Sequence, residues 1–316
     1  MRLLTKVFKK FSAAIILSAI LISLVPTKSF AMGRVADSEP EHYPESQTNV
    51  QSVEKHLETV RNKNVAAYQR ATLTYNGKNI GNDSLIINGK VYVSLRSFIN
   101  TITNMNVSYD SKRKTLYVNG QGLELSVSDG AYAVYANGRI LFSMTPSAVM
   151  SNGRMYTPLS SVAKALGLSL SENVSASSAT LKGSVRALQH GSSYYREDAV
   201  YWLSRIISAE SQGESLIGQI AVGNIVMNRV LSKDFPNTIW GVIFDRKYGV
   251  QFSPVANGTI YNAPSQTSVT AAKICLEGFS LSEEVLFFLE PRISTSSWIP
   301  KTRKYVFSIG HHDFYS

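Results

Sequence analysis

The sequence feature that most constrains the fold is an internal repeat in the first half of the chain. Residues 88–95 (NGKVYVSL) recur as residues 152–159 (NGRMYTPL), at an offset of 64. A pattern typical of a short helix follows each copy, over 97–104 and 161–166, with Gly167 as the stop signal of the second. Self-similarity of this kind indicates that one supersecondary unit occurs twice.

Turn signals and alternating apolar residues indicate that the repeated unit is mainly β-structure. Asn-Gly dipeptides tolerate the positive φ angles of two-residue hairpin turns. Five of them begin at Asn76, Asn88, Asn119, Asn137 and Asn152. Val91, Val93 and Leu95 alternate with other residues after one such turn, as in a half-buried strand. We expect further strands to complete the two copies, at 106–109 with 115–118 and at 168–170 with 179–181.

The stretches NGKVYVSLRSF, YD and KTLYVNG resemble the copper amine oxidase N-terminal-like domain, a tandem β-β-α-β module common in exported bacterial proteins. The resemblance covers residues 71–183. No His or Cys occurs between His56 and His190, so this section lacks the imidazole and thiolate ligands that suit copper. We therefore interpret it as a binding or spacer module.

The first 31 residues have the pattern of a secretory signal peptide. Basic residues between Arg2 and Lys10 precede an apolar stretch at 11–25, and Ser29-Phe30-Ala31 fits a cleavage site. The stretch is shorter than the ~20 residues that span a bilayer, so cleavage is preferred over an uncleaved anchor. The sequence predicts a secreted protein with no stable membrane span after cleavage.

Composition and charge exclude some classes of protein. With 44% hydrophobic residues the chain is not disordered, and the single Cys275 excludes a disulfide scaffold. The formal charge of +10 includes five basic residues of the signal peptide. The excess positive charge of the mature chain lies in residues 71–195, which include eleven basic and five acidic residues. For an exported protein this charge suits anionic wall polymers better than nucleic acid. The alternative is that it only maintains solubility.

These patterns predict five segments. They are a signal peptide at 1–31, a linker at 32–70, the binding or spacer module at 71–183, a second linker at 184–195 and a mainly helical domain at 196–316.

One predicted helix of the last segment carries a glutamate on its apolar stripe. Leu203, Ile206, Ile207 and Glu210 follow the i, i+3, i+4, i+7 spacing, and Gly213 suits a left-handed residue after the helix end. Burial and the negative end of the helix dipole both disfavour a charged Glu210, so we expect a raised pKa. A raised pKa suits a general acid near neutral pH. The alternative is an ordinary helix-end glutamate that faces solvent.

A second glutamate lies four residues further on. Glu214 and Ser215 begin another predicted helix, whose apolar stripe extends from Ile217 to Ile225. Negative charge is favoured at the start of a helix. We therefore interpret Glu214 as a charge that stabilises this helix.

Four motifs, SRIISAESQGESLIGQIAVGNIVMNRV, FPNTIWGVIF, QFSPVANG and SIGHHDFY, occur in this order within 196–316 and closely resemble the SleB-type cell wall hydrolases, the family of spore cortex-lytic enzymes. The resemblance implies an α+β architecture with a lysozyme-like, mainly helical catalytic domain, beside the separate β-β-α-β module. It also implies cleavage of peptidoglycan between N-acetylmuramic acid and N-acetylglucosamine, with Glu210 as the catalytic acid. Ser211-Gln212 replaces a common Ala-Arg pair, and Pro254 stands where the family often has Trp.

The mechanism depends on the number of carboxylates. No other acid of this segment lies in a motif that resembles a nucleophile site, and most are interpreted as solvated. These acids are Asp234, Asp245, Glu277, Glu283, Glu284, Glu290 and Asp313. One carboxyl suffices when the muramic acid 6-hydroxyl attacks its own C1, which is lytic transglycosylation. A muramidase that uses water, and usually two carboxylates, is the alternative.

Substrate contacts are expected in two places. Gln251, Phe252 and Ser253 form a polar-aromatic loop that suits N-acetyl groups and a sugar ring. Trp298 is a candidate stacking platform. The alternatives are a core position for Phe252 and a buried anchor for Trp298.

No metal or cofactor is expected. His311 and His312 have no carboxylate or cysteine partners at ligand spacing, and Cys275 in an apolar run is interpreted as a core thiol. The lack of an HExxH motif disfavours a zinc amidase or peptidase. A non-catalytic wall-binding protein is a further alternative. The expected partner is peptidoglycan, from vegetative wall or spore cortex, and the expected state is a monomer in the cell wall or spore envelope.

Overall fold

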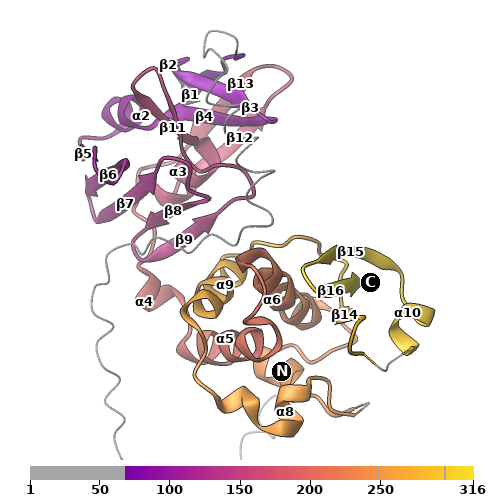
Figure 1. Cartoon of the computed structure of the whole chain (residues 1–316). Coiled ribbons are helices and arrows are strands. Elements are labelled where there is room, and N and C mark those ends of the chain that lie inside the picture. Colours follow the sequence, from indigo (N-terminus) through magenta and orange to yellow (C-terminus); the bar gives the residue numbers. More distant parts are fainter. Residues whose placement is uncertain (1–67, 248, 295–296) are drawn as a thin grey trace, which may run out of the picture. The chain divides into compact units, whose positions relative to one another are not determined.

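The computed structural model describes residues 68–247, 249–294 and 297–316 (Figure 1). The predicted signal peptide and almost all of the predicted linker at 32–70 lie outside the described residues. None of the helices in these ranges combines the length and the hydropathy needed to cross a membrane.

The described residues up to Lys182 form three sheets and two short helices. The strands are β1 (Thr72–Tyr75), β2 (Lys78–Gly81), β3 (Ser84–Ile87), β4 (Lys90–Ser94), β5 (Asn106–Asp110), β6 (Thr115–Gly120), β7 (Leu123–Ser128), β8 (Ala133–Ala136), β9 (Arg139–Phe142), β10 (Val149–Ser151), β11 (Arg154–Pro158), β12 (Ser169–Asn173) and β13 (Ser178–Lys182). The helices are α2 (Leu95–Ile102) and α3 (Leu159–Ala165). The sheet orders are β12-β13-β1-β2, β10-β11-β4-β3 and β5-β6-β7-β8-β9.

The two copies of the sequence repeat pair with each other. Strands β4 and β11 are antiparallel neighbours, and Val93 lies opposite Thr157, its own equivalent in the repeat. Both residues are fully buried, and the apolar side chains of both copies form one continuous core. Each predicted helix is present and begins two residues earlier than expected. The repeat thus forms one body around a local two-fold relation.

Most of the predicted Asn-Gly turns are present. The asparagine has a positive φ at Asn76, Asn88, Asn137 and Asn152. The turn predicted at Asn119 is wrong, because Asn119 and Gly120 continue strand β6 and pair with β7. The hairpin turns two residues later, at Gln121 and Gly122 with φ of 51° and 77°. Strand pairing has overridden the local preference of the dipeptide.

The remaining described residues are mainly helical. The helices are α4 (Gly191–Tyr194), α5 (Glu197–Ser211), α6 (Leu216–Leu231), α7 (Ile239–Ile243), α8 (Ser253–Asn257), the 3₁₀-helix η2 (Thr259–Tyr261), α9 (Gln266–Leu276) and α10 (Trp298–Thr302). Three strands, β14 (Phe287–Leu289), β15 (Tyr305–Ile309) and β16 (His312–Tyr315), form an antiparallel sheet in the order β14-β16-β15. The predicted combination of α+β architecture is confirmed.

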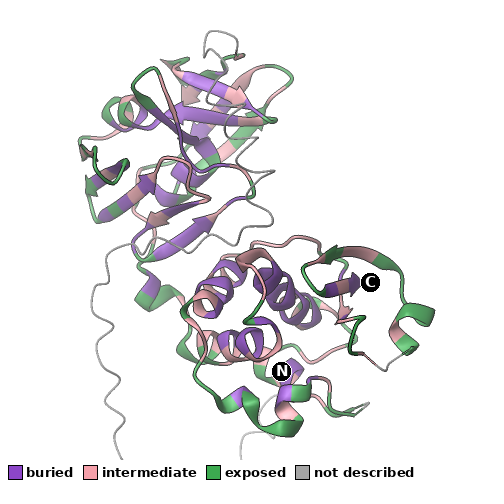
Figure 2. Cartoon of the chain, in the orientation of Figure 1, coloured by how far each residue is buried: buried purple, intermediate pink, exposed green. Residues whose placement is uncertain are grey.

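Helices α5, α6 and α9 pack against one another and bury their apolar faces (Figures 1 and 2). Gly223 allows this close approach, since a Cβ there would lie 2.7 Å from Cys275 Sγ and 2.8 Å from Ile207 Cδ1. Burial raises the pKa of the Cys275 thiol to about 12, and its prediction as a core thiol is confirmed. This packing fixes the C-terminal end of α5.

The small sheet is fixed on α6. Phe314 of β16 is fully buried in a cluster with Ala221, Val222 and Ile225 of α6. The sheet therefore has a defined position beside the helices, and its strand β14 contributes residues to the cavity described below.

Candidate active site

Glu210 occupies the last turn of α5, as predicted. Glu197 and Asp198 lie in the first turn of this helix, where acidic side chains complement the helix dipole. Leu203, Ile206 and Ile207 are fully buried on its inward stripe. Glu210 lies on the same side of the helix but is half-buried, so its carboxyl is at the border between core and cavity.

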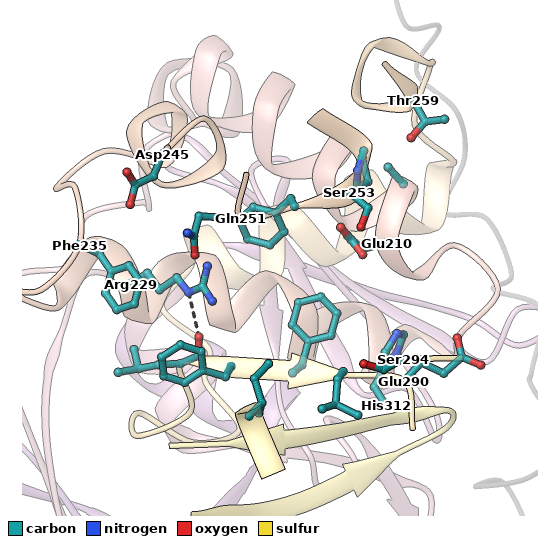
Figure 3. A pocket seen from close by; sticks show the side chains of 18 of the residues that line it. Glu210, Arg229, Phe235, Asp245, Gln251, Ser253, Thr259, Glu290, Ser294 and His312 are labelled. Atoms are coloured by element: carbon teal, nitrogen blue, oxygen red, sulfur yellow. Dashed lines mark hydrogen bonds between the residues drawn. The ribbon is translucent and has the colours of Figure 1, made fainter. Parts of the chain in front are cut away.

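The environment of Glu210 favours the protonated carboxyl. Burial raises its pKa to about 7, and no hydrogen bond or charge from the described residues contributes to the shift. The expected raised pKa is confirmed, with desolvation as the cause. Figure 3 shows the side chain of Ser253 beside the Glu210 carboxyl. A half-buried acid with this pKa can both give and accept a proton near neutral pH.

Helix α5 ends without the left-handed glycine that the sequence suggested. Gly213 is absent from the positive-φ residues, and Gln212 closes the helix in the right-handed region, with φ −60° and ψ −23°. The turn is short, since the Glu214 amide donates to the Ser211 carbonyl over 2.9 Å. Ser215 then caps α6 through a 3.3 Å bond from the Gly218 amide to its hydroxyl.

Glu214 contacts the C-terminal hairpin. Its side chain is only 8% exposed and accepts hydrogen bonds from the His311 amide (3.2 Å) and the His311 ring Nδ1 (2.7 Å). A Cβ at Gly310, whose φ is +58°, would lie 1.7 Å from Glu214 Oε2, so a side chain there would be strained and would displace the Glu214 carboxylate. Glu214 precedes the helix cap, as predicted, and it also joins the start of α6 to the turn between β15 and β16.

A large cavity of about 1450 Å³ opens in front of Glu210 (Figure 3). Segments from α5, α6, α8, β14, α10 and β16 line it. Its aromatic lining residues are Phe235, Phe252, Phe287, Phe288 and Trp298. Its charged or ionisable lining residues, besides Glu210, are Arg205, Arg229, Lys233, Asp234, Asp245, Lys247, Glu290, Arg303 and His312. A mixed apolar and polar lining of this size suits a carbohydrate chain.

The structure brings all of the predicted contact residues to this cavity. Gln251, Phe252, Ser253 and Trp298 each line it. Ser253 begins helix α8, so the predicted loop is in part a helix. Phe252 is only 2% exposed and packs in the core, which was the alternative for this residue. Trp298 is exposed at the start of α10, where its ring meets the edge of Phe287, so it is not a buried anchor.

Pro254 is buried near the start of α8. Proline fits the first turn of a helix because the missing amide hydrogen has no intrahelical partner there. This residue therefore shapes the entrance of the helix that carries Ser253, and it offers no ring for stacking.

Arg229 is a cavity residue that sequence reasoning missed. It is buried, and its Nε donates to the Leu286 carbonyl over 2.8 Å. The guanidinium lies 4.9, 5.3 and 5.4 Å from the ring centres of Phe235, Phe252 and Phe287. Burial lowers its pKa to about 10, opposed by the nearby charge of Asp245. Its position in an apolar helix stripe gave no signal that it would reach a cavity.

The other carboxylates have different surroundings. Most of these acids were expected to be solvated, but the Glu277 side chain is 3% exposed and accepts bonds from Arg139 (2.7 Å, to both oxygens), Lys164 (2.9 Å) and Tyr195 (2.8 Å). Burial alone would raise the pKa of Glu277, but these donors outweigh it and lower the pKa. Glu290 lines the cavity, and Figure 3 shows its carboxylate directed away from Glu210.

The two histidines separate at the end of the chain. His311 is exposed and pairs with Glu214, whereas His312 begins β16 and is buried. Burial lowers the pKa of His312, against the opposing charges of Glu214 and Glu290. Its Nδ1 lies 3.9 Å from Glu214 Oε1. His312 therefore links the wall of the cavity to the Glu214 contact.

Comparison with known proteins gives two family matches. Residues 213–315 match the Cell Wall Hydrolase family, and residues 74–181 match the copper amine oxidase N-terminal domain. The spore cortex-lytic enzyme of Bacillus cereus is 36% identical over 120 residues, which cover 38% of this chain and 45% of that enzyme. The spore cortex-lytic enzyme of Bacillus subtilis is 37% identical over 112 residues, which cover 35% of each protein. The catalytic domain of the germination-specific lytic transglycosylase SleB from Bacillus anthracis is 35% identical, with 39% of this chain and 97% of that domain covered and a TM-score of 0.36.

The chain therefore carries a domain of the cell wall hydrolase family. More narrowly, this domain is homologous to those of the spore cortex-lytic enzymes, and it follows a copper amine oxidase N-terminal-like domain. Both family predictions are confirmed. The chain spans less than half of the length of these two spore cortex-lytic enzymes. The family match begins at Gly213, after Glu210.

Proposed function

We propose that this protein cleaves the glycan strands of peptidoglycan by lytic transglycosylation, with Glu210 as the single acid and base. The observation that carries the proposal is the half-buried Glu210, with a pKa near 7, at the wall of a large cavity. The homology to spore cortex-lytic enzymes supports the substrate class. A lysozyme-like arrangement of the helical domain is part of the same proposal.

In the first step the protonated Glu210 gives its proton to the glycosidic oxygen between N-acetylmuramic acid and N-acetylglucosamine. The bond from C1 of muramic acid to that oxygen breaks, and its electron pair leaves with the oxygen. The Glu210 carboxylate then accepts the proton of the muramic acid 6-hydroxyl while the oxygen of this hydroxyl attacks C1. The products are a 1,6-anhydro end and a new 4-hydroxyl, and Glu210 is protonated again.

A muramidase is the second candidate function. Ordinary glycosidases use a second carboxylate to activate water or to attack the sugar, and Glu290 and Asp245 line the same cavity. The direction of the Glu290 carboxylate, away from Glu210 in Figure 3, favours the single-carboxyl mechanism.

The β-structured module has a supporting role in this proposal. Its net positive charge suits the anionic polymers of a bacterial wall, and it contains no His or Cys to bind copper. We propose that it holds the exported enzyme to the cell wall or spore envelope. Vegetative wall and spore cortex are both candidate substrates.

The test is the release of soluble fragments from purified vegetative and cortex peptidoglycan by the mature protein and its Glu210→Gln variant. Glu197→Gln is the matched control, since it makes the same change at the exposed opposite end of α5. We expect Glu210→Gln to lose at least about a hundredfold in rate, as for loss of a general acid, and Glu197→Gln to keep the wild-type rate. Equal release by all three proteins would refute the role of Glu210. No release by any would leave a wall-binding protein, and activity lost on chelation would favour a zinc amidase.

A further inference from the structure

A cluster of five aromatic side chains lies on the helical domain outside the residues that line the cavity. Trp240 of α7 stacks on Phe244, with ring centres 5.1 Å apart. Trp202 of α5 meets the edges of Phe244 at 5.1 Å, Tyr201 at 4.9 Å and Tyr261 of η2 at 6.3 Å. We call these five residues the aromatic surface.

The outer rings of this surface face solvent. Trp240 is 56% exposed, Tyr261 62% and Tyr201 41%. Trp202 and Phe244 are half-buried and hold the exposed rings in place through the edge and stacking contacts. Large contiguous apolar patches on a protein surface often mark binding sites. Rings that are already fixed lose little conformational freedom when a ligand binds.

The aromatic surface begins where the cavity ends. Arg205 lines the cavity, and its guanidinium lies 3.6 Å from the centre of the Tyr201 ring. Two more residues that line the cavity are close in sequence to residues of the aromatic surface. Asp245 follows Phe244 directly, and Thr259 is in the same 3₁₀-helix as Tyr261. Tyr201 is nine residues before Glu210 in α5, which is about 13 Å along the helix axis and about half a turn around it, so the continuity with the cavity passes through Arg205.

From this continuity we propose that the aromatic surface binds sugar rings of the same glycan strand, beyond those held in the cavity. The proposal rests on the proposed function and extends it. The occupant is a run of β-1,4-linked, N-acetylated sugars, because their rings present C–H faces to aromatic planes and their edges stay in water. Tyr and Trp combine a flat apolar face with a polar edge, which suits such a ligand. None of the five residues carries a charge for an anionic partner.

The proposal predicts a dependence on strand length. The variants are Trp240→Ala, Tyr261→Ala and their combination, and the matched control is Tyr305→Ala, an exposed tyrosine on β15 that does not line the cavity. Rates are measured on long glycan strands and on a short muropeptide oligosaccharide that fills only the cavity. We expect each removed ring to lower the rate on long strands about fivefold, with the rate on the short substrate unchanged.

A binding measurement tests the aromatic surface independently of the cleavage mechanism. In the Glu210→Gln background, the affinity for isolated insoluble glycan strands is measured by sedimentation, with the same surface variants and control. The conservative Trp240→Phe and Tyr261→Phe variants should retain binding, which separates a lost ring from a disturbed fold. Binding and long-strand rates equal to those of Tyr305→Ala, or equal losses on long and short substrates, would overturn the proposal. Strand binding that depends on the two rings would uphold it even if the mechanism of cleavage proved different.

Discussion

The raised pKa of Glu210 predicts a stability difference that depends on pH. The carboxyl has a pKa of about 7 in the folded protein and an ordinary value of 4.5. Its contribution to stability is therefore fully present below about pH 4.5 and is lost as the pH rises through about 7. The shift corresponds to roughly 3 kcal/mol at most. Because the carboxyl borders an open cavity, we expect about 1 to 3 kcal/mol.

Glutamine cannot ionise and removes this dependence. The assay is urea unfolding of the mature protein and of Glu210→Gln at about pH 5 and about pH 8, chosen to bracket the titration. The difference in free energy of unfolding, variant minus wild type, should increase by about 1 to 3 kcal/mol from about pH 5 to about pH 8. Comparison at two pH values cancels the effects of the substitution that do not depend on pH. Glu197→Gln, at the exposed end of α5, serves as the control. The same wild-type-to-variant difference at both values would refute the buried, uncharged state of Glu210.

Three further predictions follow from the same contacts. The rate of strand cleavage should fall with rising pH above about 7, since Glu210 must be protonated to act as an acid; a rate that rises steadily to pH 9 or so would contradict this. Gly310→Ala should destabilise the fold by about 1 to 3 kcal/mol, measured by thermal unfolding, because its Cβ would collide with Glu214; an unchanged midpoint would count against that contact. Glu277→Ala should cost about 3 to 5 kcal/mol in urea unfolding, because it leaves the buried Arg139 without its carboxylate; a loss below about 1 kcal/mol would show that the pair is solvated.

Local pattern predicted where Glu210 lies, whereas its catalytic role was inferred from the resemblance to the cell wall hydrolases and stays a prediction. An apolar stripe at helical spacing placed the residue on the inward side of α5, and its position at the helix end left it next to a cavity. The same reasoning could not find Arg229, which reaches the cavity only because α6 packs beside the small sheet. The bond between Glu214 and His311 joins residues that are far apart in the sequence, and no local signal predicts such a contact.

The same distinction holds for the β-structured module. Asn-Gly dipeptides and alternation predicted most strands and turns, because these depend on neighbouring residues. The pairing of β4 with β11 depends on how the two repeat copies pack against each other. The presence of a repeat in the sequence does not predict this packing. At Asn119 the pairing of β6 with β7 prevailed over the turn preference of the dipeptide.

The measurement that tests the central claim most directly is mass analysis of the fragments released from peptidoglycan in oxygen-18-labelled water. Lytic transglycosylation with Glu210 as acid and base predicts 1,6-anhydro-muramic ends that contain no label, and none of these fragments with Glu210→Gln. Reducing muramic ends that carry one labelled oxygen would contradict the single-carboxyl mechanism and establish hydrolysis by water.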